Sequence, residues 1–133
     1  MTALVLWGPV AAWMLAIFVV SGMAAPPAMP GGLSYGTGHA LAYGLLAALA
    51  ARALAGGRWD GVRWGTLAGA WVMAAAYGVL DEWHQSFVPG RTADGADLVA
   101  DATGAAAALA IVAAWGAVRA RRRPARAPEN REV

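Results

Sequence analysis

Cysteine and lysine are both missing from this chain of 133 residues. Without cysteine there is no disulfide framework, no thiolate metal site and no cysteine nucleophile. Charged residues of either sign are also scarce: they make up 14% of the chain against 59% hydrophobic residues, and the first formally charged side chain is Arg52. This composition, with its apolar residues in long blocks, lies outside the range of soluble globular proteins. It indicates an integral membrane protein.

The basic residues are all arginines, and six of the ten lie at or after Arg119. A short arginine-rich tail beside an apolar helix is typical of a topology signal that also contacts anionic lipid headgroups. The tail has no interleaved aromatic residues and no recognition fold, so we expect no nucleic-acid partner. Its charge and its two prolines predict a disordered cytoplasmic tail over residues 119–133.

Proline and glycine clusters divide the rest of the chain into apolar stretches of roughly the 20 residues that cross a bilayer. The expected membrane spans run from about residue 4 to 22, 37 to 55, 62 to 80 and 97 to 118. The third is expected to continue as helix through Gln85, because the next helix breaker is Pro89. No basic segment precedes the first span, which favours a retained helix over a cleaved signal peptide. The sequence predicts an all-α polytopic membrane protein with a four-helix domain over residues 1–118.

Arginine placement predicts the orientation of these spans, because loops retained in the cytoplasm carry the excess of basic residues. With four spans, the loop that holds Arg52, Arg58 and Arg63 lies on the same side as the tail. We therefore expect both termini in the cytoplasm. The connection around residues 26–32 and the segment between residues 81 and 97 then face outward.

The third and fourth spans are joined by the most polar part of the chain. Five of the eight acidic residues and one of the two histidines lie between Asp81 and Asp101. Ionisable groups at a membrane edge are costly to keep, so such a concentration is a functional-site hypothesis by default.

Topology brings further polar groups to the same level, because His39 and Tyr43 open the second span at the outer face. Helical spacing places Asp94, Asp97 and Asp101 on one face of the fourth span, extended by the small residues Gly104 and Ala108, which favour close helix packing. The catalytic candidates are His39, Asp81 and Glu82. The ligand-binding candidates are Tyr43, His84, Gln85, Arg91, Asp94, Asp97 and Asp101.

Some of these residues have simpler interpretations. Asp94 or Asp97 can cap the fourth helix through its free backbone N–H groups. Arg91 is expected to pair with one of the carboxylates, since an unpaired charge at this depth is costly. His39 by itself is more typical of an interhelical hydrogen bond than of a ligand.

Three chemistries remain open for the whole cluster. It can act as an acid/base pair, with a carboxylate and a histidine exchanging a proton. It can bind a cation, although no ligand spacing such as HExxH is present, so the pattern names no metal ion and no cofactor. It can also be a polar lock that only holds the helices together.

The central stretch resembles the signature of VanZ-like membrane proteins, through Asp81-Glu82-Trp83-His84-Gln85-Ser86-Phe87-Val88-Pro89-Gly90-Arg91 followed by Asp94, Asp97, Asp101 and Gly104. Upstream, His39-Ala40-Leu41-Ala42-Tyr43 is similar to that family's HxxxY at the head of the second helix. Many members carry an Asp-Lys pair just before this histidine, where the present chain has Tyr35-Gly36. A contact made by that lysine is therefore absent here.

The resemblance implies a small bacterial inner-membrane protein whose namesake is linked to low-level resistance to the glycopeptide teicoplanin. From it we expect an outward-facing polar pocket that acts on or binds a cell-envelope lipid or lipid-linked glycan. In this role Arg91 would contact an anionic group, and membrane lipids would be the partners. The alternative is a non-catalytic membrane protein that excludes the drug or supports a partner complex.

Overall fold

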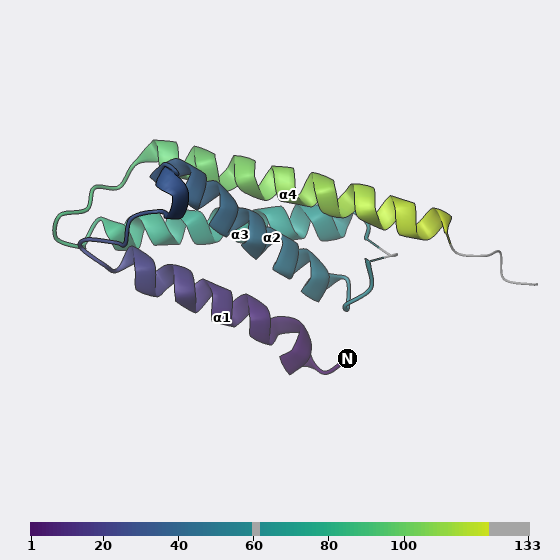
Figure 1. Cartoon of the computed structure of the whole chain (residues 1–133). Coiled ribbons are helices and arrows are strands. Elements are labelled where there is room, and N and C mark those ends of the chain that lie inside the picture. Colours follow the sequence, from purple (N-terminus) through teal and green to yellow (C-terminus); the bar gives the residue numbers. More distant parts are fainter. Residues whose placement is uncertain (60–61, 123–133) are drawn as a thin grey trace, which may run out of the picture.

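The computed structural model describes residues 1–59 and 62–122, and within these ranges the chain is all-α, without strands. The four α-helices are α1 (Ala3–Ser21), α2 (Tyr35–Leu54), α3 (Trp64–Gln85) and α4 (Gly95–Arg121), and a short 3-10 helix, η1 (Pro30–Gly32), lies between the first two. Figure 1 shows the helices running side by side as an elongated bundle. The all-α prediction is confirmed, and α3 does continue through Gln85.

Side-chain caps explain two of the helix starts. Ser34 Oγ accepts a hydrogen bond from Thr37 N–H at 3.1 Å and begins α2. Asp94 Oδ1 accepts from Ala96 N–H at 2.9 Å and begins α4. Each cap satisfies one of the backbone donors that a helix leaves free at its N-terminus. Both helices therefore start two residues before the predicted spans.

Helix α1 contains a proline in its interior, Pro9. Proline has no N–H, so the carbonyl one turn earlier, that of Val5, loses its helical partner. Arg52 Nη1 donates to this Val5 oxygen at 3.2 Å. The end of α2 thus supplies the hydrogen bond that the sequence of α1 removes.

Helix α2 is the centre of the bundle, with Leu46, Ala47 and Ala50 fully buried. Its closest neighbour is α4, and small residues set their separation. A side chain on Gly104 would collide with the backbone of Ala40, and one on Gly44 would lie 3.1 Å from the Gly104 carbonyl oxygen. Glycine at both positions allows the two backbones to touch, as in tightly packed membrane helices.

Aromatic donors link the helices through backbone carbonyl groups. Trp13 Nε1 donates to Ala42 O at 2.9 Å, Tyr77 Oη to Met14 O at 2.7 Å, and Trp71 Nε1 to Ala102 O at 3.0 Å. These bonds tie α1 to α2, α1 to α3 and α3 to α4. Each aromatic ring packs its apolar body while satisfying its polar atom.

The surface of the bundle is apolar on every helix. The exposed fraction is 62% for Leu15 on α1, 60% for Leu41 on α2, 57% for Val79 on α3 and 71% for Ile111 on α4. Helices α1 and α4 are long and apolar enough to cross a membrane. Exposed apolar surface of this extent marks an interaction with lipid or protein. Together these features indicate a membrane protein.

Helix α4 is longer than the sequence predicts. It continues through Arg119 to Arg121, past the expected boundary at residue 118. The Arg119 guanidinium lies 5.2 Å from the centre of the Trp115 ring, a cation–π contact that favours this last turn. The rest of the predicted disordered tail, residues 123–133, lies outside the described residues.

The close crossing of α2 and α4 can be tested at Gly104. In Gly104→Ala the new methyl group meets the Ala40 backbone, which cannot yield without separating the helices. We expect a loss of about 1–3 kcal/mol, the usual cost of overpacking. The measurement is the unfolding of the purified protein in detergent.

Gly95→Ala, on the same helix, is the matched control. Nothing lies within 4 Å of a side chain at Gly95. Its stability should therefore be unchanged or slightly increased. Equal stability of the two variants would contradict the tight crossing.

Candidate functional site

Polar residues from all four α-helices meet at one end of the bundle. Ser21 ends α1, and His39 and Tyr43 lie in the first turns of α2. Asp81, Glu82 and Gln85 end α3, and Asp97 and Asp101 begin α4. The sequence therefore folds so that its scattered polar positions share one level, as its topology predicts.

The first group of contacts surrounds Asp81, which is 3% exposed. Its Oδ2 accepts from Ser21 Oγ at 2.8 Å and from Gln85 Nε2 at 3.1 Å. The amide oxygen of the buried Gln85 accepts from Arg91 Nη2 at 2.6 Å. We call Ser21, Asp81, Gln85 and Arg91 the Asp81 network. It links α1, α3 and the loop after α3.

The second group surrounds His39, whose side chain is 14% exposed. Its Nδ1 lies 3.0 Å from Asp101 Oδ1, and its Nε2 lies 3.6 Å from Asp97 Oδ2. Glu82 lies beside them, and its Oε2 accepts from the Asp94 N–H at 2.8 Å. We call His39, Glu82, Asp97 and Asp101 the His39 network. It links α2, α3 and α4.

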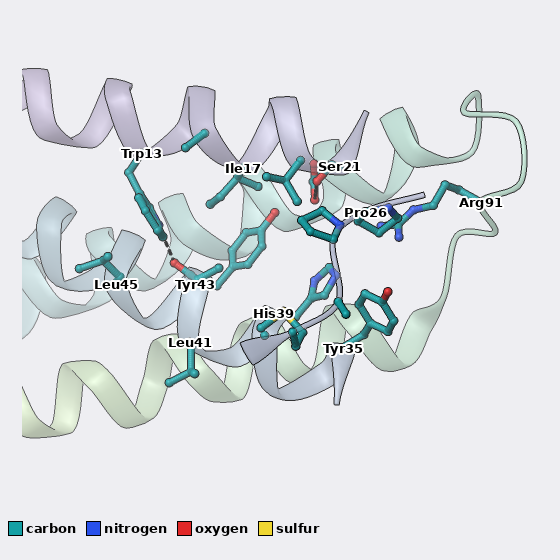
Figure 2. A pocket seen from close by; sticks show the side chains of 18 residues that line it. Trp13, Ile17, Ser21, Pro26, Tyr35, His39, Leu41, Tyr43, Leu45 and Arg91 are labelled. Carbon is teal, nitrogen blue, oxygen red and sulfur yellow. Dashed lines mark hydrogen bonds between the residues drawn. The ribbon is translucent and has the colours of Figure 1, made fainter. Parts of the chain in front are cut away.

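Gly78 makes room for Asp101 against α3. A side chain there would lie 2.8 Å from Asp101 Oδ2 and 3.4 Å from the Tyr43 ring. Glycine therefore lets a buried carboxylate and a buried phenol share the space between three helices. Figure 2 shows the Tyr43 hydroxyl pointing toward Ile17 and Ser21 of α1.

Several buried polar atoms in these networks have no hydrogen-bond partner among the described residues. They are the Tyr43 hydroxyl, Asp81 Oδ1, Glu82 Oε1 and Asp101 Oδ2. A buried polar atom without a partner costs about 1–3 kcal/mol, and more when it is charged. Such atoms are otherwise rare in native structures, so a group of four at one site requires an explanation.

A cavity of about 670 Å³ opens beside the networks, between α1, α2 and the connection that joins them. Most of its wall is apolar, and Figure 2 shows Trp13 and Leu45 at the end away from Arg91. Figure 2 shows the polar side chains His39, Arg91 and Ser21 gathered at one end, with Tyr35 beside them. The cavity is therefore amphipathic: it is apolar over most of its length and polar at one end.

Comparison with known proteins identifies the chain. The model of the VanZ/LLP1 family matches residues 15–116, which include both networks and the lining of the cavity except Trp13. The chain belongs to the VanZ/LLP1 family. No curated protein and no solved structure matches it.

The VanZ signature residues divide into those that line the site and those that do not. His39, Tyr43, Asp81, Glu82, Gln85, Arg91, Asp97 and Asp101 lie in the networks or on the cavity wall. His84 instead stacks on Phe18 of α1, with ring centres 4.4 Å apart. The Asp94 side chain is exposed and caps α4, as its simpler interpretation predicts.

The expected ion pair between Arg91 and a carboxylate is not formed in the described part of the chain. Arg91 bonds to the neutral amide of Gln85, which in turn donates to Asp81. The five-residue loop from Ser86 to Gly90 carries Arg91 back over Gln85 and holds it one side chain away from Asp81. Gln85 therefore separates Arg91 from Asp81, one of the several carboxylates with which the sequence predicts a pair.

Ser21 is the site residue that sequence reasoning missed. It is 6% exposed and joins α1 to the Asp81 network. The available signal was its place as the one hydroxyl residue in the last turn of an apolar span, at the level of Asp81.

The contact between Ser21 and Asp81 predicts a stability effect. Ser21→Ala leaves the buried Asp81 without one donor, and hydrogen bonds to charged groups contribute about 1.5–3 kcal/mol. We expect a loss of that order in unfolding experiments in detergent. Ser86→Ala is the control, because the exposed Ser86 bonds only to Trp83 O. If the two variants lose equal stability, Ser21 does not tether α1.

Proposed function

We propose that this VanZ/LLP1 protein binds a cell-envelope lipid or lipid-linked glycan in the amphipathic cavity. The observation that carries the proposal is the distribution of its lining. Trp13, Ile17, Val20 and Leu45 offer an apolar wall along its length, while His39 and Arg91 stand at one end. This arrangement suits a ligand with an acyl or prenyl chain and a charged head.

The charges at the polar end favour an anionic head. Arg91 donates one hydrogen bond to Gln85 and keeps its other N–H donors for a ligand on the cavity side. A guanidinium binds phosphate and carboxylate groups through paired donors. Arg91 would thus hold the headgroup, with Tyr35 and His39 next to it.

In this proposal the protein crosses the bacterial inner membrane four times, with both termini in the cytoplasm and the cavity on the outer side. Support comes from the arginine clusters of the loop after α2 and of the last turn of α4. Outward placement would give the site access to lipid-linked precursors of the cell wall. An effect on susceptibility to teicoplanin would follow from binding such a component.

Topology has a direct test with reporters fused after Val133. Green fluorescent protein should fluoresce and alkaline phosphatase should be inactive, since the first folds in the cytoplasm and the second requires the periplasm. The same pair inserted after Pro89 should give the opposite result. A periplasmic C-terminus would invert the placement of the cavity.

Lipid binding can be tested by blocking the cavity. Ala16 lines it from α1, so Ala16→Phe should fill part of its volume. Lipids extracted from the purified variant and quantified by mass spectrometry should fall at least several-fold per protein. Ala11→Phe is the control, because Ala11 is also exposed on α1 but does not line the cavity.

The polar end needs a separate variant. Arg91→Gln should reduce retention of phosphatidylglycerol relative to phosphatidylcholine when both are offered in nanodiscs. Arg63→Gln, at the opposite end of the bundle, should not. Unchanged lipid content in both Ala16→Phe and Arg91→Gln would contradict the proposal that the cavity binds lipid.

The second candidate is a structural role in which the polar cluster only holds the helices together. The observation in its favour is that each network joins three parts of the chain through buried or partly buried hydrogen bonds. Under this alternative, Asp81→Asn destabilises the protein, while Ala16→Phe changes neither the bound lipid nor glycopeptide susceptibility. Binding instead predicts loss of lipid and susceptibility phenotype together in a stable Ala16→Phe protein.

A further inference from the structure

The His39 network contains a group of three side chains that converge from three different helices. His39 of α2, Glu82 of α3 and Asp97 of α4 each offer a ligand atom, and these atoms all lie within 4.8 Å of one another. His39 Nε2 and Asp97 Oδ2 lie 3.6 Å apart. Ligand atoms at about 2.0–2.2 Å from a tetrahedral cation are on the order of 3.3 Å apart. Small side-chain movements would therefore complete the geometry.

Asp101 orients His39 for this role. The carboxylate accepts at Oδ1 from the ring at 3.0 Å, so Nδ1 carries the hydrogen in the neutral imidazole. Nε2 then holds a lone pair directed toward the side of Asp97. A carboxylate behind a histidine is the usual second partner of a metal-bound imidazole, because it fixes the ring and raises its basicity.

Glu82 provides an independent observation. It is only 5% exposed, and the Asp94 N–H holds its Oε2, while its Oε1 is enclosed without a partner. A carboxylate fixed at one oxygen presents the other to a defined position. An added cation would satisfy this oxygen, which no described residue does.

The charges at the site also favour a bound cation. Four carboxylates, those of Asp81, Glu82, Asp97 and Asp101, gather at this end, and the basic side chain that approaches them is the His39 imidazole, 3.0 Å from Asp101 and 3.6 Å from Asp97. The guanidinium of Arg91 donates to the Gln85 amide and forms no ion pair with these four carboxylates. Buried charges require pairing or metal coordination.

We propose that His39 Nε2, Glu82 and Asp97 bind one divalent cation of the Mn²⁺, Fe²⁺ or Zn²⁺ class. One imidazole nitrogen and two carboxylate oxygens suit these borderline ions better than Ca²⁺, which takes six to eight oxygen ligands. Three protein ligands leave coordination positions open. Since His39 also lines the cavity, the cation lies at its polar end, within reach of an anionic headgroup.

The test uses the full chain in detergent, with any affinity tag removed and metals stripped by a chelator. Zn²⁺ is titrated by isothermal calorimetry, and Co²⁺ is added separately so that its visible spectrum reports nitrogen and oxygen ligands. We expect one ion per chain. His39→Gln, Glu82→Gln and Asp97→Asn should each weaken binding more than about 10-fold, and Asp101→Asn about 10- to 100-fold as a positioning residue.

Asp94→Asn is the matched control, because its side chain is exposed and asparagine also caps a helix. Its affinity should equal that of the parent. Asp97, with 23% of its side chain exposed, is the ligand whose substitution least disturbs folding, so it decides the outcome if the Glu82 variant unfolds. Absence of saturable Zn²⁺ binding, or equal affinity of Asp97→Asn and the parent, would overturn the site.

The cation site does not depend on lipid binding, and one variant tests the two proposals separately. Ala16→Phe blocks the cavity at a position outside the three ligands, so it should keep the parent affinity for Zn²⁺. Metal binding without lipid would refute the proposed function alone. Lipid binding without metal would refute the cation site alone.

Discussion

The contact of α2 with α4 at Ala40 and Gly104 determines the rest of the site. Because the two backbones touch there, His39, one residue before Ala40, meets Asp101, one turn before Gly104, at 3.0 Å. A larger residue at position 104 would move the imidazole away from both aspartates. Glycine at this crossing therefore does more than permit packing, since it sets the distance at which a histidine and a carboxylate interact in an apolar bundle.

The adjacent residues Asp81 and Glu82 explain why the polar cluster separates into two networks. Successive residues on a helix point about 100° apart. Asp81 therefore faces α1, where Ser21 donates to it, while Glu82 faces the start of α4, where the Asp94 N–H donates to it. One helix end thus serves two sites. The Asp81 network joins α1 to the bundle, and the His39 network joins α2, α3 and α4.

Sequence reasoning predicted most of the fold because long apolar runs, proline and glycine clusters and capping residues are local signals. It also placed eight of its ten site residues together, since topology alone brings the ends of spans to one level. It could not predict the partner of Arg91, which depends on the course of a loop, nor the contact of the His84 ring with Phe18 of α1. Ser21 and Gly78 act through neighbours on other helices. The place of Ser21 at the end of an apolar span was its one signal in the sequence, and Gly78 has none.

The two networks differ in what surrounds their open positions. Asp81 Oδ2 has two donors, and its amide partner Gln85 is bonded at both ends, while Asp81 Oδ1 is enclosed without a partner. In the His39 network, Glu82 and Asp101 each keep one enclosed oxygen without a partner, and His39 directs a second nitrogen toward Asp97. Among the described residues, the His39 network is where a histidine and two carboxylates bring ligand atoms within 4.8 Å of one another. Each open position costs stability, so a polar lock alone gains nothing from it. The proposed cation would offset that cost in the His39 network.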